Sequence, residues 1–308
     1  MGKLKIKIRR KPLEGNFTLL FFELFPLPKK KIYINREFGI LTACSKGWFI
    51  GLQMLISSIA HFYDVKLLVL DIGMTSQQIE WCKKQPGVIV KPFKIPEYQS
   101  HIQYAGAWFK PHYIYESPFK HTIWIDCDAM VVGDLRELID WSHPSALFTS
   151  DHTQLKESTL NHPNLYSYMP IGKAYYHDIC PYINSGVFII NKKRDEKILS
   201  DWKYCVDQAC SIKSIADTIS CWDQGSLKWS LHKNDKLYLI VPDKKFNYPA
   251  TIRHFSYPAT PESVIHWMKN CKPKDACIVL HWMGSPKPWR NWGEMLNIDL
   301  TILNETYI

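Results

Sequence analysis

Hydrophobic positions between residues 38 and 281 follow two alternating patterns. Short continuous apolar runs, such as those at 38–43 and 122–125, have the length and composition of buried strands. Between Leu52 and Phe62, apolar residues recur instead at three- and four-residue steps, the period of a helix with one buried face. The same patterns predict further strands at 65–70, 88–90, 146–149, 187–190 and 276–280, and further helices at 75–84, 108–115, 195–207 and 224–231.

Strands that alternate with helices are typical of an α/β fold, in which helices cover a sheet. Thr75 and Gln78 have the spacing of a capping box, which supports the start of the helix that follows them. We therefore expect a single domain over residues 37–308, preceded by a basic N-terminal extension at residues 1–36. In open α/β sheets, ligands bind beyond the carboxyl ends of the strands, so the candidate chemistry is sought there.

The composition fits a folded domain with charged partners. Of the 308 residues, 46% are hydrophobic and 22% charged, which excludes disorder as the dominant state. A net charge of +9 favours anionic partners. Both signs are interspersed along the body of the chain, so no nucleic-acid partner is expected. The apolar stretch at 17–25 is too short to span a bilayer and contains Glu23, so the N-terminal segment is interpreted as an ordinary extension rather than a targeting segment. Its basic residues at 2–12 and 29–31 could still contact anionic lipids peripherally.

The nine cysteines are scattered and include no CxxC pair. Such spacing is typical of reduced thiols in a cytosolic protein. We therefore expect a cytoplasmic location, at most peripheral to a membrane.

Acidic residues and a histidine stand where predicted strands end. Asp126 and Asp128 follow the strand at 122–125, and His281 follows the strand at 276–280. Two carboxylates and an imidazole can share one divalent cation, and this donor set favours Mn²⁺, with Mg²⁺ as the alternative. The two aspartates would equally serve as ordinary turn or helix-capping residues.

Polar residues elsewhere could complete a nucleotide-sugar site. Gly284 allows close backbone approach, and Lys287 supplies a positive charge for phosphates. The Asn-Ser-Gly and Asp-Gln-Gly triplets at 184–186 and 223–225 are predicted at strand-to-loop transitions, where their side chains could bind sugar hydroxyls or simply form turns. Neither GxGxxG nor a P-loop motif occurs, which gives no support to dinucleotide or NTPase sites.

Five ordered segments carry a family resemblance: LTA, WIDCDAMVVGDL, YINSGVFIIN, WDQGSL and HWMGSPKPW. Together they resemble the retaining glycosyltransferases of family 8, the glycogenin and bacterial lipopolysaccharide galactosyltransferase group, over about residues 38–292. The resemblance implies a GT-A fold, with a mixed, mostly parallel central sheet flanked by helices. It also implies Mn²⁺-assisted transfer of a hexose from a UDP-sugar donor to a hydroxyl of a glycan or glycoconjugate acceptor.

The resemblance further implies roles for single residues. Asp126, Asp128 and His281 would bind the metal, and Asp223 and Gln224 would lie beside the anomeric carbon. Because an amide is a poor nucleophile, front-face departure and attack, with Gln224 as electrostatic support, is the preferred mechanism. The donor-binding residues would be Thr42, Ala43, Trp48, Lys110, Asp126, Asp151, Asn184, Ser185, Gly284 and Lys287.

Two positions depart from the family pattern. Trp48 needs an insertion to stack on uracil, and Lys228 stands where the family often has asparagine. The long, tyrosine-rich segment at 152–183 is a candidate acceptor site, with a packed surface excursion as the alternative. A catalytically inactive nucleotide-sugar-binding protein of the same fold is the alternative function.

Overall fold

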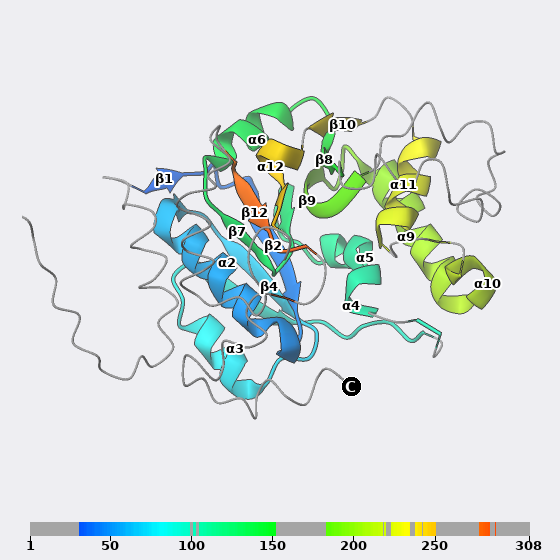
Figure 1. The fold of residues 1–308 in the computed structure, drawn as a ribbon, viewed down its shortest axis with the longest axis horizontal. Helices are drawn as coiled ribbons and strands as arrows, with labels where there is room; N and C mark the ends of the chain where they lie inside the picture. Colours follow the sequence, from blue (N-terminus) through cyan, green and yellow to red (C-terminus); the bar gives the residue numbers. More distant parts are fainter. Residues whose placement is uncertain are drawn as a thin grey trace, which may run out of the picture.

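The computed structural model describes residues 31–98, 101–102, 105–151, 183–217, 219, 223–234, 238–241, 243–250, 277–283 and 287 (Figure 1). Its strands are β1 (Ile32–Tyr33), β2 (Phe38–Cys44), β3 (Tyr63–Asp64), β4 (Leu67–Asp71), β5 (Val88–Pro92), β6 (His121–Ile125), β7 (Ala129–Val131), β8 (Ala146–Ser150), β9 (Ile183–Asn191), β10 (Tyr238–Val241), β11 (Tyr248–Pro249) and β12 (Val279–His281). Its helices are the 3₁₀ helix η1 (Lys46–Trp48), α2 (Phe49–Phe62), α3 (Ser76–Lys83), α4 (Ala105–Trp108), α5 (Lys110–Tyr115), α6 (Leu135–Trp141), α9 (Glu196–Ser211), α10 (Lys213–Ala216), α11 (Asp223–Lys233) and α12 (Asp243–Phe246).

The central sheet is mixed and mostly parallel, which confirms the expected fold class. In the part of the chain that the structure describes it has seven strands, in the order β10-β8-β9-β6-β2-β4-β5. Among these strands β9 alone runs antiparallel to its neighbours, β6 and β8. The first residues of β9 therefore lie at the same edge of the sheet as the last residues of β6 and β8, with Ile183 opposite Ser150.

Helices cover both faces of this sheet (Figure 1). Because successive side chains of a strand point to opposite faces, Leu41 and Trp124 join a buried cluster with residues of α5, α9 and α11. Ile40 and Ile123 join a second cluster with residues of α2 and α6 on the other face. Strands buried on both faces need apolar residues at every position, which accounts for the continuous hydrophobic runs in the sequence.

A second sheet, with three strands among the described residues, determines where His281 lies relative to Asp126 and Asp128. β12 pairs antiparallel with β7 and parallel with β11. β7 begins directly after the Asp126-Cys127-Asp128 turn, and its register places His281 opposite Ala129. The short strand β7, which the hydrophobic pattern did not predict, thus brings the histidine next to the two aspartates.

Several elements differ from the sequence-based prediction. The α3 capping box is confirmed, since the Thr75 hydroxyl accepts from the Gln78 backbone and the Gln78 side chain accepts from the Thr75 backbone. The Asn-Ser-Gly triplet at 184–186 lies within β9, not at a strand-to-loop transition. Asn184 pairs with Thr149 of β8, and the register then shifts before Phe188 pairs with Phe148. The Asp-Gln-Gly triplet at 223–225 forms the first turn of α11 rather than a turn after a strand.

The segment expected as an N-terminal extension is described only from residue 31. There β1 pairs with β3, so residues 32–33 pack on the domain. The boundary at residue 36 remains a prediction. Residues 1–30, and residues 152–182 with the candidate acceptor tyrosines, lie outside the described residues.

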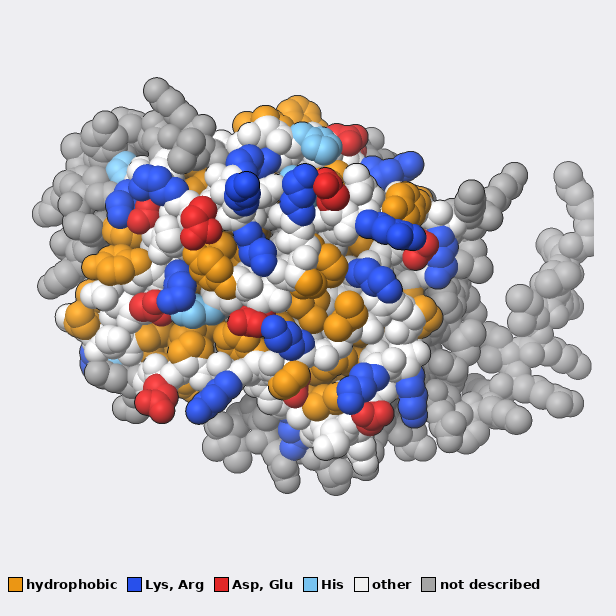
Figure 2. Space-filling view, turned by 180° about the vertical axis from the view of Figure 1, so that it is seen from behind, with side chains coloured by type: hydrophobic (Ala, Val, Ile, Leu, Met, Phe, Trp, Pro, Cys, Tyr) orange, Lys and Arg blue, Asp and Glu red, His pale blue; other side chains and the backbone are white. Residues whose placement is uncertain are grey.

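On the face shown in Figure 2, Lys and Arg side chains are spread among Asp and Glu side chains rather than gathered in one patch. Among the described helices, none combines the length and the apolar character needed to cross a membrane.

Candidate active site

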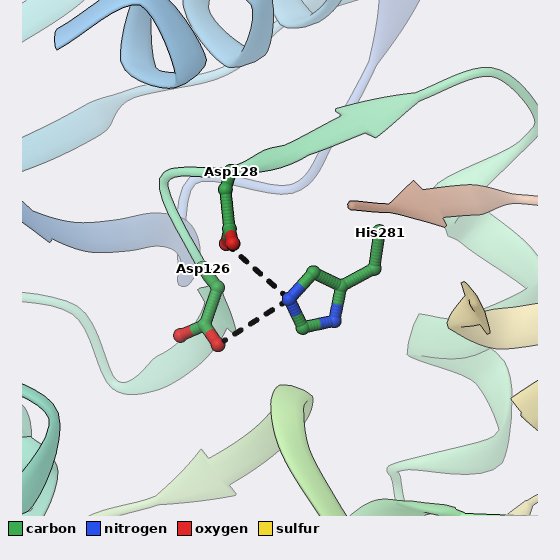
Figure 3. A group of neighbouring side chains, drawn as sticks. All are labelled: Asp126, Asp128 and His281. Atoms are coloured by element: carbon green, nitrogen blue, oxygen red, sulfur yellow. Dashed lines mark ion pairs between the residues drawn. The ribbon is translucent and has the colours of Figure 1, made fainter. Parts of the chain in front are cut away.

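Two carboxylates and one imidazole converge at the edge where β6 ends. Asp126 and Asp128 lie in the turn between β6 and β7, and His281 is the last residue of β12 (Figure 3). Nε2 of His281 is 3.3 Å from Oδ1 of Asp128 and 3.7 Å from Oδ2 of Asp126. One ligand atom from each residue can be chosen so that all three lie within 4.8 Å of one another.

This group fits a divalent cation. Metal–oxygen bonds of about 2 Å hold the ligands of one ion within roughly 4 Å of each other, so only a small closure of the site is required. Two carboxylate oxygens and one imidazole nitrogen suit Mn²⁺, and fewer than six protein ligands leave positions for phosphate oxygens. Asp126, Asp128 and His281 are therefore the residues that would hold the ion.

Lys287 places a buried positive charge beside the same group. Its Nζ donates to Oδ2 of Asp128 at 2.5 Å and also to the carbonyl of Trp282. Burial alone would raise the pKa of Asp128, but the neighbouring Lys287 and His281 outweigh it and hold that pKa well below its usual range. The ammonium also lies 4.9 Å from the ring centroid of Trp48, so the structure brings this half-buried tryptophan to the rim of the site.

A second lysine joins the Asp126 carboxylate to α11. Nζ of Lys110 is 2.8 Å from Oδ1 of Asp126 and 2.8 Å from Oδ2 of Asp223. It also donates to the Ser185 backbone carbonyl at 3.1 Å, while the Ser185 hydroxyl donates to Asp223. Burial would lower the pKa of Lys110, but the two aspartates outweigh it and raise that pKa above its ordinary value, so the lysine stays charged.

At Asp223, burial has a larger effect on the pKa than the neighbouring lysine does. The residue is 4% exposed, and burial raises the pKa of its carboxyl above the usual value although Lys110 opposes the shift. The charge of Asp126 adds to the rise. Lys110 is thus the cation that allows two carboxylates to remain near each other in a largely buried site.

Gly186 connects the Asp126–Asp128 turn with His281. Its carbonyl accepts from the Asp126 backbone at 2.8 Å, and its N–H donates to Oδ1 of Asn184 at 2.7 Å. A Cβ at this position would overlap the His281 ring and the Asn184 side chain. Any side chain larger than hydrogen would therefore displace the imidazole, which explains the glycine inside a strand.

The remaining residues that the sequence predicted for the site lie at the ends of β2 and β8, in the first turn of α11, or outside the described residues. Thr42 and Ala43 are buried near the end of β2, the strand beside β6. Asp151 directly follows β8 and is 1% exposed, while Gln224 is half-buried next to Asp223. Gly284 lies outside the described residues.

The pattern-based analysis missed three residues that contact the candidate ligands or their neighbours. Nε1 of Trp124 donates to Oδ1 of Asp126 at 2.7 Å. Asn247, 1% exposed, lies 3.1 Å from Nδ1 of His281, and its amino group donates to Thr149 and Asn184. Trp124 and Thr149 sit inside apolar strands, and Asn247 belongs to no motif, so the sequence carried no separate signal for them.

Known structures match the chain over most of its length. The galactosyltransferase LgtC, in complex with donor and acceptor sugar analogues, matches with a TM-score of 0.52 at 16% identity, over 84% of this chain and 94% of LgtC. An active-site mutant of LgtC gives the same values. The glycosyltransferase GlyE of Streptococcus pneumoniae TIGR4 matches with a TM-score of 0.51 at 18% identity, over 87% of this chain. This chain spans 63% of the length of GlyE.

No family model matches the sequence, and no curated protein matches it. At identities of 16–18%, the structural likeness establishes the fold and leaves the chemistry to be argued from the residues. The resemblance drawn from the five ordered motifs is confirmed at this level. The chain has the GT-A fold of the galactosyltransferase LgtC.

Proposed function

We propose that this protein is a retaining glycosyltransferase that moves a hexose from a UDP-sugar to a hydroxyl of a glycan or glycoconjugate, with Mn²⁺ held by Asp126, Asp128 and His281. The observation that carries the proposal is the convergence of these three ligands with Lys110 and Lys287 at one edge of the sheet. A nucleotide diphosphate needs this combination, because its phosphates bind both a metal ion and further positive charge.

The leaving diphosphate sets the main electrostatic demand of the reaction. A divalent cation bound at this site would supply positive charge to the β-phosphate. Lys287, within reach of Asp128, adds an ammonium on the same side, where negative charge develops as the sugar departs. Trp48 borders this lysine and would shield the phosphate end of the donor from water.

The residues around α11 would act on the sugar. The Asp223 carboxylate is already engaged by Lys110 and Ser185, so its role is to position charge rather than to attack the anomeric carbon. The neighbouring Gln224 is half-buried and carries a weakly nucleophilic amide. We therefore favour departure of UDP and attack of the acceptor on the same face of the sugar, with Gln224 supporting the positive charge.

Hydroxyls of the donor sugar would be bound by Asp151, Asn184 and Ser185. The Asn184 oxygen is occupied by Gly186 and Asn247, whereas its amino group donates to the sulfur of Met283 at 3.7 Å. A thioether is a weak acceptor, so a sugar hydroxyl could replace it at little cost. The acceptor site in the segment 152–183, the cytoplasmic location and the peripheral membrane contact remain predictions.

Incubating the purified protein with a panel of UDP- and GDP-sugars, with and without Mn²⁺, tests the proposed function. We expect slow Mn²⁺-dependent release of UDP from one donor by hydrolysis, faster when an acceptor is present. Binding of UDP with Mn²⁺ but no release from any donor, across a panel of acceptors, would favour the inactive sugar-nucleotide-binding protein. No binding of any nucleotide would contradict the proposal.

Replacing Lys287 with alanine should weaken UDP binding in the presence of Mn²⁺ by about 10- to 100-fold, the loss expected for one hydrogen bond to a charged group. Calorimetric titration with UDP measures the change, and thermal unfolding checks that the fold persists. Lys120→Ala is the matched control, because Lys120 pairs with Glu37 on the surface just before β6, at the opposite end of that strand from Asp126. Equal UDP affinity in the two variants would remove Lys287 from the donor site.

A further inference from the structure

The imidazole of His281 is supported on its far side by a buried chain of amides. Asn247 lies directly before β11, and its Oδ1 is 3.1 Å from Nδ1 of His281. Its Nδ2 is 2.8 Å from Oδ1 of Asn184 and 3.1 Å from Oγ1 of Thr149. The Asn184 oxygen in turn accepts from the Gly186 backbone at 2.7 Å.

The backbone fixes the direction of every hydrogen bond in this chain. The N–H of Gly186 can only donate, so the Asn184 atom that faces it is the amide oxygen. That oxygen requires a donor on its other side, so the Asn247 atom beside it is the amino group. Thr149 agrees, because its hydroxyl directs its proton to the backbone carbonyl of Asn184 or Val187 and so accepts from Asn247.

The orientation of Asn247 leaves its oxygen facing His281. An amide oxygen only accepts, so Nδ1 of the imidazole must carry a proton. The other ring nitrogen, Nε2, then faces Asp128 and Asp126 at 3.3 and 3.7 Å and is the ring atom directed at the proposed cation site. Gly186 closes the opposite boundary, because a Cβ there would overlap the ring.

We propose that Asn247 is a positioning residue of the metal site, which fixes the ring of His281 with its proton on Nδ1 and with Nε2 directed at the two carboxylates. The inference rests on the proposed Mn²⁺-dependent function and adds a residue on which metal affinity depends. A hydrogen-bond acceptor behind a ligating histidine sets the tautomer and the ring orientation, and its loss weakens metal binding by about 10- to 100-fold.

Two substitutions separate positioning from packing. Asn247→Leu keeps the branched shape of the side chain, with bulkier methyl groups, but neither donates nor accepts, whereas Asn247→Asp keeps an acceptor for Nδ1–H and loses the amino group that donates to Asn184 and Thr149. We expect the leucine variant to bind Mn²⁺ about 10- to 100-fold more weakly, and the aspartate variant to stay within about threefold of wild type. If Asn247 served only to hold Asn184 and Thr149, both variants would lose affinity equally, which would overturn the inference.

Asn234→Leu is the matched control. Asn234 is also a buried asparagine, 3% exposed, and its amino group donates to Asp201 and to the Ser230 carbonyl, away from the metal ligands. It should lose thermal stability without losing Mn²⁺ affinity. An equal loss of affinity in Asn234→Leu and Asn247→Leu would trace the effect to general destabilisation and would contradict the assigned role.

Titration with Mn²⁺ alone, followed by the electron paramagnetic resonance signal of the free ion, measures affinity without any turnover. Nitrogen modulation in the pulsed spectrum of the bound ion reports ligation by His281 and should disappear in Asn247→Leu. If the wild-type protein binds no Mn²⁺, the proposed metal site itself is wrong. The wild-type titration shows this before any variant is compared.

A measurement with a diamagnetic ion tests the tautomer independently. Protein labelled with ¹⁵N-histidine and observed by NMR with Mg²⁺, which competes for Nε2 with the two carboxylates, should show His281 with its proton on Nδ1. Asn247→Leu should lose this preference, while Asn234→Leu should retain it. A wild-type ring that carries its proton on Nε2 would overturn the inference whatever the Mn²⁺ titration gives.

Discussion

Asp128→Asn is expected to abolish sugar transfer, lowering the rate at least about a thousandfold while the chain remains folded. The substitution removes one charge and almost no volume, but Asp128 is one of two carboxylates available to the metal and the partner of Lys287. Without the charge, the divalent cation binds weakly, and the ammonium of Lys287 faces a neutral amide. Mn²⁺-dependent UDP release and the Mn²⁺ titration measure the two effects, and circular dichroism checks the fold.

Asp134→Asn provides the comparison for this variant. Asp134 caps α6 by accepting from the Arg136 backbone, and asparagine caps a helix about equally well. The control should therefore retain transfer within about twofold. Full transfer by Asp128→Asn in excess EDTA would contradict the metal role of this turn.

Lys110→Met is expected to lower the free energy of unfolding by about 3–5 kcal/mol at pH 7.5, because it removes the cation shared by two carboxylates. Methionine keeps much of the buried alkyl chain, so the loss reports the charge rather than packing. Urea unfolding of the variant and the wild type at two pH values measures the difference.

The loss should be smaller at pH 5. Burial and the charge of Asp126 raise the pKa of Asp223, and Lys110 opposes that rise. Without the lysine the folded-state pKa climbs further above the unfolded value of about 4, so the folded state binds a proton more tightly than the unfolded state. Stability is then retained at low pH and lost as the pH rises through the folded-state pKa.

Lys83→Met is the matched control for Lys110→Met. Lys83 pairs with Glu80 on the surface, with side chains 54% and 59% exposed, and such pairs contribute at most about 1 kcal/mol. The control should lose little stability at either pH. A loss below about 1 kcal/mol for Lys110→Met at pH 7.5, or a loss that grows on acidification, would show that Lys110 does not stabilise the two carboxylates.

The fold was predictable where a single local rule decided the structure. The Thr75–Gln78 capping box and the apolar period of α2 required no tertiary information. The strand β7 is too short for a hydrophobic period, and asparagine, serine and glycine at 184–186 favour turns in isolation. Pairing of β9 with β8 overrides that preference, since Ile183 and Asn184 lie opposite Ser150 and Thr149 across the sheet.

The sequence predicted the candidate metal ligands, but it did not predict the contacts that hold their side chains in place. Asp126, Asp128 and His281 were expected together because strand ends meet at one edge, and the structure brings them within ligand distance. The bridge from Lys110 to Asp223 depends on α5 and α11 both packing against α9, which sequence spacing does not encode. Asn247 likewise gains its role only from the fold that places it behind the histidine.

The pairing of β12 with β7 has a consequence for how the protein matures. The contact between Asp128 and Lys287 joins residues 159 positions apart, and contacts of such separation form late because a long loop must close first. A chain synthesised at about 5–20 residues per second exposes the two aspartates well before the histidine and lysine emerge. The proposed metal centre can therefore be completed only after β12 has docked against β7, late in the synthesis of the chain.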